Sequence, residues 1–324
     1  MDSKCYQNYL KILHKELIPA MGCTEPIAIA FAAAKARQVL GAMPEEMVAL
    51  CSGNIIKNVK GVNVPNAGGQ KGIEVAAVLG ALAGDADLEL EVISRVPPEA
   101  ADQVRRLVAQ GVCRCELAEG VENLCIRIEA KAGADTAVVE VKTKHNHIAR
   151  IEKNGQVLLE ADDIPTEDAG DKSQLNLKDI LEFADTVEIG DVKELLDQQI
   201  NCNSAIAREG LEGNWGAGVG RTLLEVNGDG VRTLAMANAA AGSDARMNGC
   251  ALPVVINAGS GNQGITCTMP VVTYAREMGV SDEKLYRALT LTNLIALHQK
   301  RYIGNLSAYC GAVSAGTAAA CGVA

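Results

Sequence analysis

The sequence predicts an α+β protein, an all-helical domain with an inserted domain of helices packed on a mostly antiparallel sheet. Residues 45–160 contain stretches that alternate polar and apolar side chains and are rich in β-branched residues, as strands are. The segments 1–44 and 165–324 have helical periodicity instead. Only 3% of the 324 residues are aromatic, whereas glycine numbers 32. Such a core is built from closely approaching helices rather than from large side chains.

The first 42 residues predict two helices. The first lies within "MDSKCYQNYLKILHKELIP", and its apolar face is made by Tyr6, Leu10, Leu13 and Leu17. The second begins at Thr24 or Glu25, has Pro26 in its first turn and ends at Gly41, which are the usual signals of a helix start and stop.

The inserted domain is expected over residues 45–160. Its strand-like stretches are "MVALCS", "LELEVISRV", "VCRCELAE", "LCIRIEAKA", "TAVVEVKTK" and "HIARIEKNG". Helical patterns follow "PNAGGQKG" and "VPPEAADQ". The later strands follow one another through short turns, which favours hairpins over crossover connections. The acidic stretch 161–175 is expected to be an exposed linker.

From about residue 176 the pattern is helical, with glycine-rich joints. The expected helices lie in "LKDILEFADTV", "DVKELLDQQINCNSAIAREG", "GVRTLAMANAAAGSDARM", "QGITCTMPVVTYAREMG", "DEKLYRALTLTNLIALHQKRYIG" and "SAYCGAVSAGTAAACGVA". The last of these ends without a capping glycine motif, a charge or a polar tail. This ending suggests a chain that has been cut short, although a docked terminal helix would also fit.

Charge and hydropathy exclude several classes of partner. The net charge of −10 argues against nucleic acid and anionic membranes, which both attract clustered Lys and Arg. No apolar run reaches the roughly 18 residues of a membrane span, and the N-terminus lacks the features of a signal peptide. We therefore expect a cytoplasmic protein with no nucleic acid and no membrane as partner. We also expect it to bind a small molecule and to form a homodimer.

The chain has eleven cysteines. In a cytosolic protein spare thiols indicate metal, cluster or catalytic use, or they fill the core as small apolar residues. The C-x-C of Cys113 and Cys115 puts two thiols on one strand face, but a zinc site would need a second ligand pair. Cys23 lies just before a predicted helix, whose N-terminus favours the thiolate. It is therefore a candidate base or nucleophile; the alternative is a buried cysteine beside a helix cap.

A glycine-rich loop, "NAGSGNQGITC" over 257–267, precedes another predicted helix. Its backbone N–H groups could close on an anion such as a substrate carboxylate. Arg246, just upstream in "SDARMNGC", is the natural bidentate partner of a carboxylate, or else a cation favoured by a helix C-terminus. Similar loops at 65–72 and 214–220 are more typical of tight turns.

Two further groups could hold metal. His145 and His147 form an H-x-H pair, which a polar hairpin turn explains better because no third ligand is near. Cys310 and Cys321 flank a helix of small residues. Their eleven-residue interval places them about 16 Å apart on one face of a straight helix, so at most one of them could join a compact cluster.

Four motifs, "GCTEP", "SDARM", "GSGNQG" and "YCGAVSAGTAAACG", occur in the order seen in a known family. Over essentially its whole length the chain resembles the L-cysteine desulfidase family, also called uncharacterised protein family 0597, which is related to the alpha part of iron–sulfur L-serine dehydratases. The resemblance implies a 4Fe–4S cluster on three cysteines, with one iron open to the substrate. Cys23 matches the family's active-site cysteine, and Cys310 matches its first cluster cysteine.

The resemblance implies a lyase that converts L-cysteine to pyruvate, ammonia and hydrogen sulfide. In this mechanism Cys23 takes the Cα proton, and Arg246 with Ser260, Gly261 and Asn262 holds the carboxylate. The other two cluster cysteines of the family lie in a C-D-G-A-x-x-G-C segment that this sequence does not contain, so the chain itself is expected to hold no intact cluster and to be inactive if truncated. The alternatives are L-serine dehydration by the same chemistry and a cluster-free domain that binds a carboxylate or amino acid.

Overall fold

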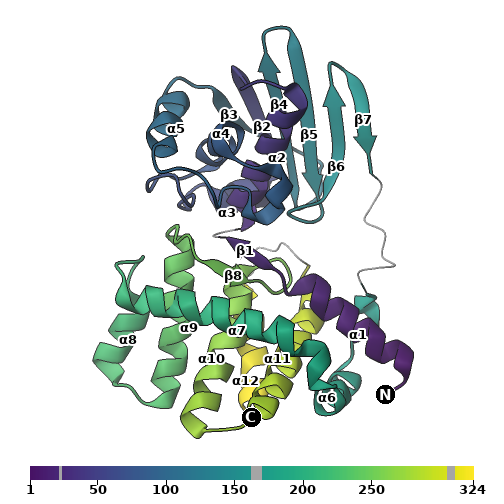
Figure 1. Ribbon diagram of the computed structural model, residues 1–324, viewed down its shortest axis with the longest axis vertical. Coiled ribbons are helices and arrows are strands. Elements are labelled where there is room, and N and C mark those ends of the chain that lie inside the picture. Colours follow the sequence, from purple (N-terminus) through teal and green to yellow (C-terminus); the bar gives the residue numbers. More distant parts are fainter. Residues whose placement is uncertain (22–23, 162–169, 305–310) are drawn as a thin grey trace. The chain divides into compact units, whose positions relative to one another are not determined.

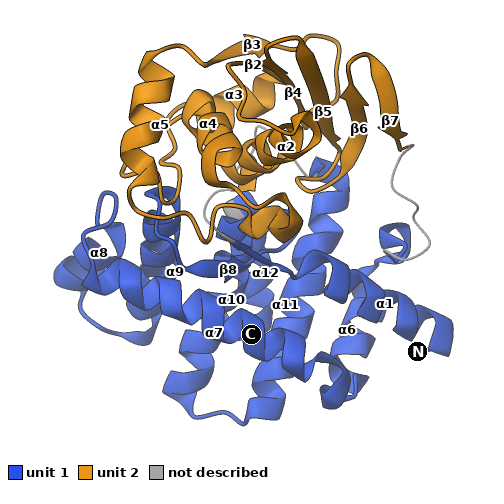
Figure 2. Ribbon diagram, turned by 45° about the horizontal axis from the view of Figure 1, so that its top comes forward, with its two compact units in different colours: residues 1–20, 165–324 blue, residues 21–164 orange. Residues whose placement is uncertain are grey.

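The computed structural model describes residues 1–21, 24–161, 170–304 and 311–324. It divides into two units (Figure 2). Unit 1 comprises Met1–Ala20 and Pro165–Ala324, and unit 2 comprises Met21–Ile164. The chain thus enters unit 2 after its first helix and returns to unit 1 for its second half.

Unit 1 is built mainly of helices (Figure 1). They are α1 (Ser3–Glu16), α6 (Leu177–Thr186), α7 (Ile189–Glu212), α8 (Val219–Asn227), α9 (Val231–Met247), α10 (Gly261–Met278), α11 (Asp282–Ile303), α12 (Gly311–Val323) and the short 3-10 helix η3 (Lys172–Gln174). The strands β1 (Pro19–Met21) and β8 (Pro253–Val255) pair in a two-stranded sheet. Unit 1 is therefore not wholly helical. Beside this short ladder, the carbonyl oxygen of Ile18 accepts a hydrogen bond from Ile256 N at 3.0 Å.

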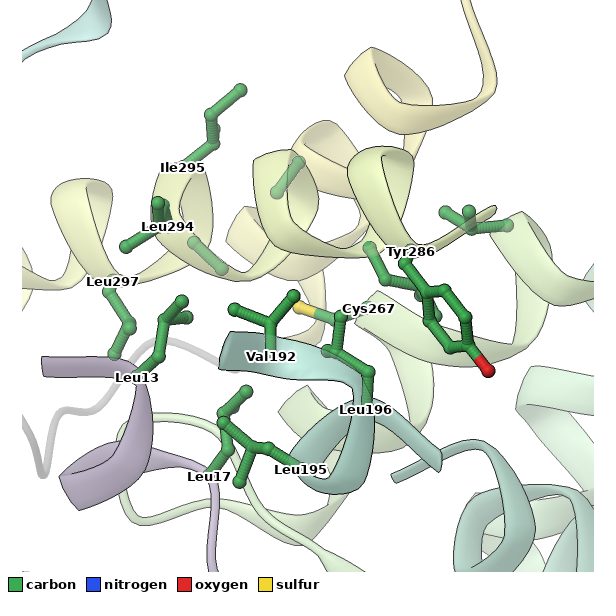
Figure 3. Close-up of a cluster of buried hydrophobic side chains, with 14 of the residues drawn as sticks. Leu13, Leu17, Val192, Leu195, Leu196, Cys267, Tyr286, Leu294, Ile295 and Leu297 are labelled. Carbon is green, nitrogen blue, oxygen red and sulfur yellow. The ribbon is translucent and has the colours of Figure 1, made fainter. Parts of the chain in front are cut away.

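The core of unit 1 is aliphatic, with few rings. Figure 3 shows the sulfur of Cys267 lying among Val192, Leu196 and other buried side chains. Helices approach closely where a glycine faces a backbone. A Cβ on Gly210 of α7 would lie 2.0 Å from the carbonyl oxygen of Ala241 on α9. The predicted tight helix packing is present at this crossing.

Unit 2 contains helices and a mixed sheet. Its elements are α2 (Thr24–Leu40), β2 (Glu46–Cys51), α3 (Gly53–Val59), α4 (Ile73–Ala83), the 3-10 helix η1 (Ala86–Glu91), α5 (Ala100–Ala109), β3 (Cys113–Leu117), β4 (Cys125–Ala132), β5 (Asp135–Lys142), β6 (Ile148–Lys153) and β7 (Gln156–Glu160). The sheet order is β3-β2-β4-β5-β6-β7. β2 and β3 run parallel, and the other neighbouring pairs are antiparallel.

One face of this sheet is buried and the other carries charge. In β4, Ile126 and Ile128 are fully buried, whereas Arg127 between them reaches toward acidic neighbours. The helix α2 packs against β4 and β5, and α4 packs against α2 (Figure 1). A Cβ on Gly80 of α4 would lie 2.1 Å from the carbonyl oxygen of Ala30, so a glycine again permits a close helix crossing.

The predicted α+β class, with helices packed on a mostly antiparallel sheet, is confirmed. One predicted strand is wrong: "LELEVISRV" forms η1 and a turn. Within this stretch the adjacent residues Val92 and Ile93 are both buried, which a strand with one buried face does not allow. Residues 21–44, expected with the flanking helical segments, lie in unit 2. Within the described ranges, no helix has the length and apolar character needed to cross a membrane.

Candidate functional site

The glycine-rich loop predicted over 257–267 forms a tight turn between β8 and α10. Asn257 and Ser260 exchange backbone hydrogen bonds of 3.1 Å in both directions. The two residues between them, Ala258 and Gly259, have φ values of 49° and 77°. Two successive left-handed residues define a type I′ turn. The turn ends at Ser260, which caps α10 because its hydroxyl accepts from Gln263 N at 3.4 Å.

Arg246 lies against the first turn of α10. Its side chain comes from the last turn of α9 and is 2% exposed. Its Nη1 donates to Asn262 Oδ1 at 3.0 Å and lies 3.6 Å from Met247 Sδ. A Cβ on Gly261 would lie 2.2 Å from Arg246 Nε. Glycine at 261 therefore gives the guanidinium its place against the helix start.

The charge at this place is positive, and no residue in the described part of the chain neutralises it. Among the described residues, Nε of Arg246 is buried without a hydrogen-bond partner, and no carboxylate forms an ion pair with this guanidinium. The N-terminus of α10 adds the positive end of its helix dipole. A buried cation without a counterion is costly, so the arrangement favours the binding of an anion. Ser260 and Asn262 are half-buried and leave the turn accessible.

A chain of buried amides supports the same turn from behind. It runs from Gln199 on α7 through Asn293 on α11 and Asn257 to Gln263 on α10, and all four are fully buried. Gln199 and Asn293 exchange hydrogen bonds of 3.0 and 2.8 Å. Asn257 donates to Asn293 Oδ1 at 2.9 Å and accepts from Gln263 Nε2 at 2.7 Å. These bonds fix the turn, because a buried amide left unpaired would cost free energy.

The free end of the amide chain faces α12. Gln263 Oε1 has no partner within the described part of the chain. A Cβ on Gly311, the first residue of α12, would lie 2.6 Å from this oxygen. The starts of α10 and α12 therefore meet at Gln263. Asn257 and Gln263 both lie in the loop predicted from the sequence, but no role was predicted for either of them. The signal was a polar residue in an otherwise apolar helix face, as at Gln199 and Asn293.

Cys23 and Cys310, the two cysteines matched by resemblance, lie outside the described residues. The remaining cysteines of unit 1 do not form a ligand set. Burial raises the pKa of both Cys250 and Cys267, and Cys321 is exposed. In the ranges that the structure describes, no three His, Cys, Asp or Glu side chains gather as a metal site requires. These donors alone do not fit a 4Fe–4S cluster, which needs three converging thiolates.

The other candidates have structural explanations. In the loop 65–72, Gln70 Nε2 donates to the carbonyl oxygens of Ala67 and Ala101 at 2.7 and 2.8 Å, so this loop is a self-satisfied turn. In the loop 214–220, a Cβ on Gly216 would lie 2.4 Å from Asp244 Oδ1. The pair His145 and His147 lies between β5 and β6, as a polar hairpin turn would place it.

Comparison with known proteins agrees with the motifs. The serine dehydratase alpha chain family matches residues 87–324. A UPF0597 protein of Finegoldia magna is 51% identical over 319 residues, covering 98% of this chain and 76% of the relative. A UPF0597 protein of Treponema denticola is 44% identical over 331 residues, covering 100% and 77%. No solved structure matches. The family expected from the four motifs is thereby confirmed, and the chain belongs to the serine dehydratase alpha chain family.

Proposed function

We propose that this chain is the catalytic part of a lyase that eliminates hydrogen sulfide from L-cysteine, giving pyruvate and ammonia. Membership of the serine dehydratase alpha chain family supports a serine dehydratase-like lyase in general. The observation that carries the finer proposal is Arg246, a guanidinium that is 2% exposed, lies beside the first turn of α10 and has an unpartnered Nε among the described residues. A small α-amino acid brings the carboxylate that this cation lacks.

The proposed chemistry has three parts. Arg246 and the first turn of α10 bind the carboxylate and stabilise the enolate-like charge that develops when the Cα proton leaves. Cys23, as a thiolate, accepts that proton. The Cβ–S bond then breaks with its electron pair going to sulfur. The aminoacrylate that remains tautomerises to an imine, and water hydrolyses it to pyruvate and ammonia.

The leaving group needs activation. A thiol leaves poorly unless a Lewis acid polarises it. The resemblance assigns this role to a 4Fe–4S cluster, with Cys310 as the one ligand that this chain matches. Cys310 is the sequence neighbour of Gly311, and a Cβ on Gly311 would lie 2.6 Å from Gln263 Oε1.

L-Serine is the second candidate substrate. The family description names serine dehydratase, and the carboxylate site would bind either amino acid equally. The two substrates differ only in the atom that leaves, so contacts to the carboxylate do not separate them. A domain that binds the amino acid without chemistry is the third candidate.

The test compares this chain with the Finegoldia magna relative after anaerobic reconstitution with iron and sulfide. Pyruvate release from L-cysteine and from L-serine is measured beside the iron content. We expect Arg246→Gln in the relative's matching position to lower kcat/KM by at least about 100-fold, because a charge-assisted bond to the developing charge is lost. Arg232→Gln, an exposed arginine on the same helix, is the matched control.

Three results would contradict the proposal. Unchanged kcat/KM in the Arg246 variant would remove the carboxylate site. Activity on L-serine with none on L-cysteine would establish the second candidate. Saturable binding of L-cysteine by an iron-loaded relative that releases no pyruvate would favour the binding domain.

A further inference from the structure

A cavity in unit 1 lies against the C-terminal half of α10, whereas the loop described above precedes the first turn of that helix. Its volume is about 300 Å³, and it is lined by Ser204, Arg208, Leu211, Leu234, Asn238, Met269, Thr273, Arg276 and Glu277. These side chains come from α7, α9 and α10. A volume of this size lies at the lower end of the range of small-molecule pockets.

The floor of the cavity is apolar and its walls are fixed. Leu211, Leu234 and Met269 supply the apolar surface. Asn238 Nδ2 donates to Thr273 Oγ1 at 3.0 Å, and Thr273 Oγ1 donates to the carbonyl oxygen of Met269 at 2.7 Å. Part of the polar wall is thus hydrogen-bonded within and between the helices.

The rim carries two arginines of different helices. Arg208 on α7 and Arg276 on α10 are both exposed, and neither forms an ion pair or a hydrogen bond within the described part of the chain. The dipole of α10 explains a cation in its last turn, but it does not explain a second guanidinium from α7 around the same cavity. The lining holds two arginines and one carboxylate, Glu277, so it carries a net positive charge.

We propose that this cavity binds a small carboxylate with an apolar tail. The carboxylate pairs with Arg208 and Arg276, whose planar guanidinium groups match carboxylate geometry. The tail lies on Leu211, Leu234 and Met269. Glu277 at the same rim distinguishes two kinds of ligand. Its carboxylate would pair with the ammonium group of an amino acid, but it would repel the carboxylate of a simple acid.

The experiment uses the full chain and two probes of similar tail length, hexanoate and L-norleucine. Binding is measured by ligand-observed NMR titration, with hexanol as the neutral control. We expect at least one acid to saturate, and hexanol to bind at least about tenfold more weakly. Arg208→Met and Arg276→Met should each weaken the acid at least about tenfold, because methionine keeps apolar volume but removes the charge. Arg232→Met, on α9 but outside the cavity, should bind as the parent does.

Two further variants separate this site from the proposed catalytic one. Leu234→Trp should abolish binding by filling the cavity, with the fold checked by circular dichroism. Arg246→Gln should leave binding unchanged. Tighter L-norleucine that Glu277→Gln weakens would identify an amino acid, and tighter hexanoate that Glu277→Gln strengthens would identify a simple acid. The proposal is overturned if neither acid saturates, if both arginine variants bind as the parent does, or if only Arg246→Gln loses binding.

Discussion

The charged face of the sheet in unit 2 and the first turn of α10 in unit 1 differ in how their buried charges are paired. On the sheet, Glu140 accepts from Lys142 at 2.6 Å and lies 3.7 Å from Arg127, its cross-strand partner. At the first turn of α10, Arg246 is more deeply buried and forms no ion pair with a described carboxylate. Charges that neighbours neutralise indicate a structural role. A buried charge to which no described residue supplies a counterion is the feature on which the proposed carboxylate site rests.

The two units share one device, a glycine at a helix crossing, and breaking it should give the largest effect. In Gly210→Ala and in Gly80→Ala the new methyl would overlap a backbone carbonyl, at 2.0 and 2.1 Å. We expect each variant to lose about 3 kcal/mol or more of unfolding free energy, because the helices must move apart. Urea unfolding followed by circular dichroism measures this loss.

The control is Gly316→Ala on α12, where a Cβ meets nothing within 4 Å. It should be stable to within about 1 kcal/mol of the parent, or gain that much from helix propensity. Trp215 is the single tryptophan of the chain and lies in unit 1, so its fluorescence reports that unit. Equal losses in Gly316→Ala and Gly210→Ala would contradict the close-crossing explanation.

The next effect concerns the buried amides, which have no counterpart on the sheet. Asn257→Ala removes the acceptor of Gln263 Nε2 and a donor to Asn293. We expect a loss of about 2 kcal/mol, because buried amide groups are left unpaired. Glu140→Gln on the sheet should cost less than about 1 kcal/mol, since its partners are partly solvated. The comparison fails if the sheet variant proves the more damaging in the same urea titration.

The next prediction concerns the reactivity of the thiols, which should differ from one cysteine to another. We expect Cys23 to be alkylated first near neutral pH, because it directly precedes Thr24, the first residue of α2, and a helix N-terminus lowers the thiol pKa. In the sheet, the hydrogen bond from Cys51 lowers the pKa of Cys115, whereas burial raises that of Cys125 to about 11.

Alkylation followed over a pH series by mass spectrometry gives the sign. A lowered pKa supplies thiolate at lower pH, so Cys115 should label at lower pH than Cys125 and before Cys51. The exposed Cys321 serves as the accessible reference thiol. Labelling of Cys125 ahead of Cys115 would contradict the sheet assignment, and an unlabelled Cys23 would contradict its role as base.

The sequence predicted those elements whose periodicity reflects one buried face. In β4, buried and more exposed residues alternate from Ile126 to Ala130. The helix α2 has its start signal at Thr24 to Pro26 and its stop signal at Gly41. The prediction failed where burial followed another pattern. "LELEVISRV" alternates for five residues and then buries Val92 and Ile93 together. The exposed strand β7 and the short helices α3 and α8 were not predicted.

At the candidate site, residue types were more informative than positions. A glycine loop and an arginine suggested an anion, but their meeting depends on Gly261 allowing the guanidinium to lie against α10, a tertiary contact without sequence periodicity. The amide chain depends likewise on Gln199 and Asn293, which lie 94 residues apart in sequence. Pairings at that separation cannot be derived from local pattern.

We expect the smallest effect from an exposed ion pair of unit 1. This result would show that the stability effect of a charge depends on its burial and not on the unit in which it lies. Asp197 on α7 pairs with Lys193 and accepts from the Tyr286 hydroxyl, and these partners lower its pKa below the usual value of 3.8. A carboxyl with a lowered folded-state pKa stabilises the protein above its unfolded-state pKa, and this stabilisation is lost as the pH falls through the folded-state pKa. We expect Asp197→Asn to cost less than about 0.5 kcal/mol at pH 7, because solvent screens the pair, and to cost nothing near pH 2. Urea titrations at both pH values measure this difference.

A cost that stayed constant with pH would assign the contribution to the Tyr286 hydrogen bond and not to the charge. A cost comparable to that of Asn257→Ala would show that exposure does not decide which charges matter here.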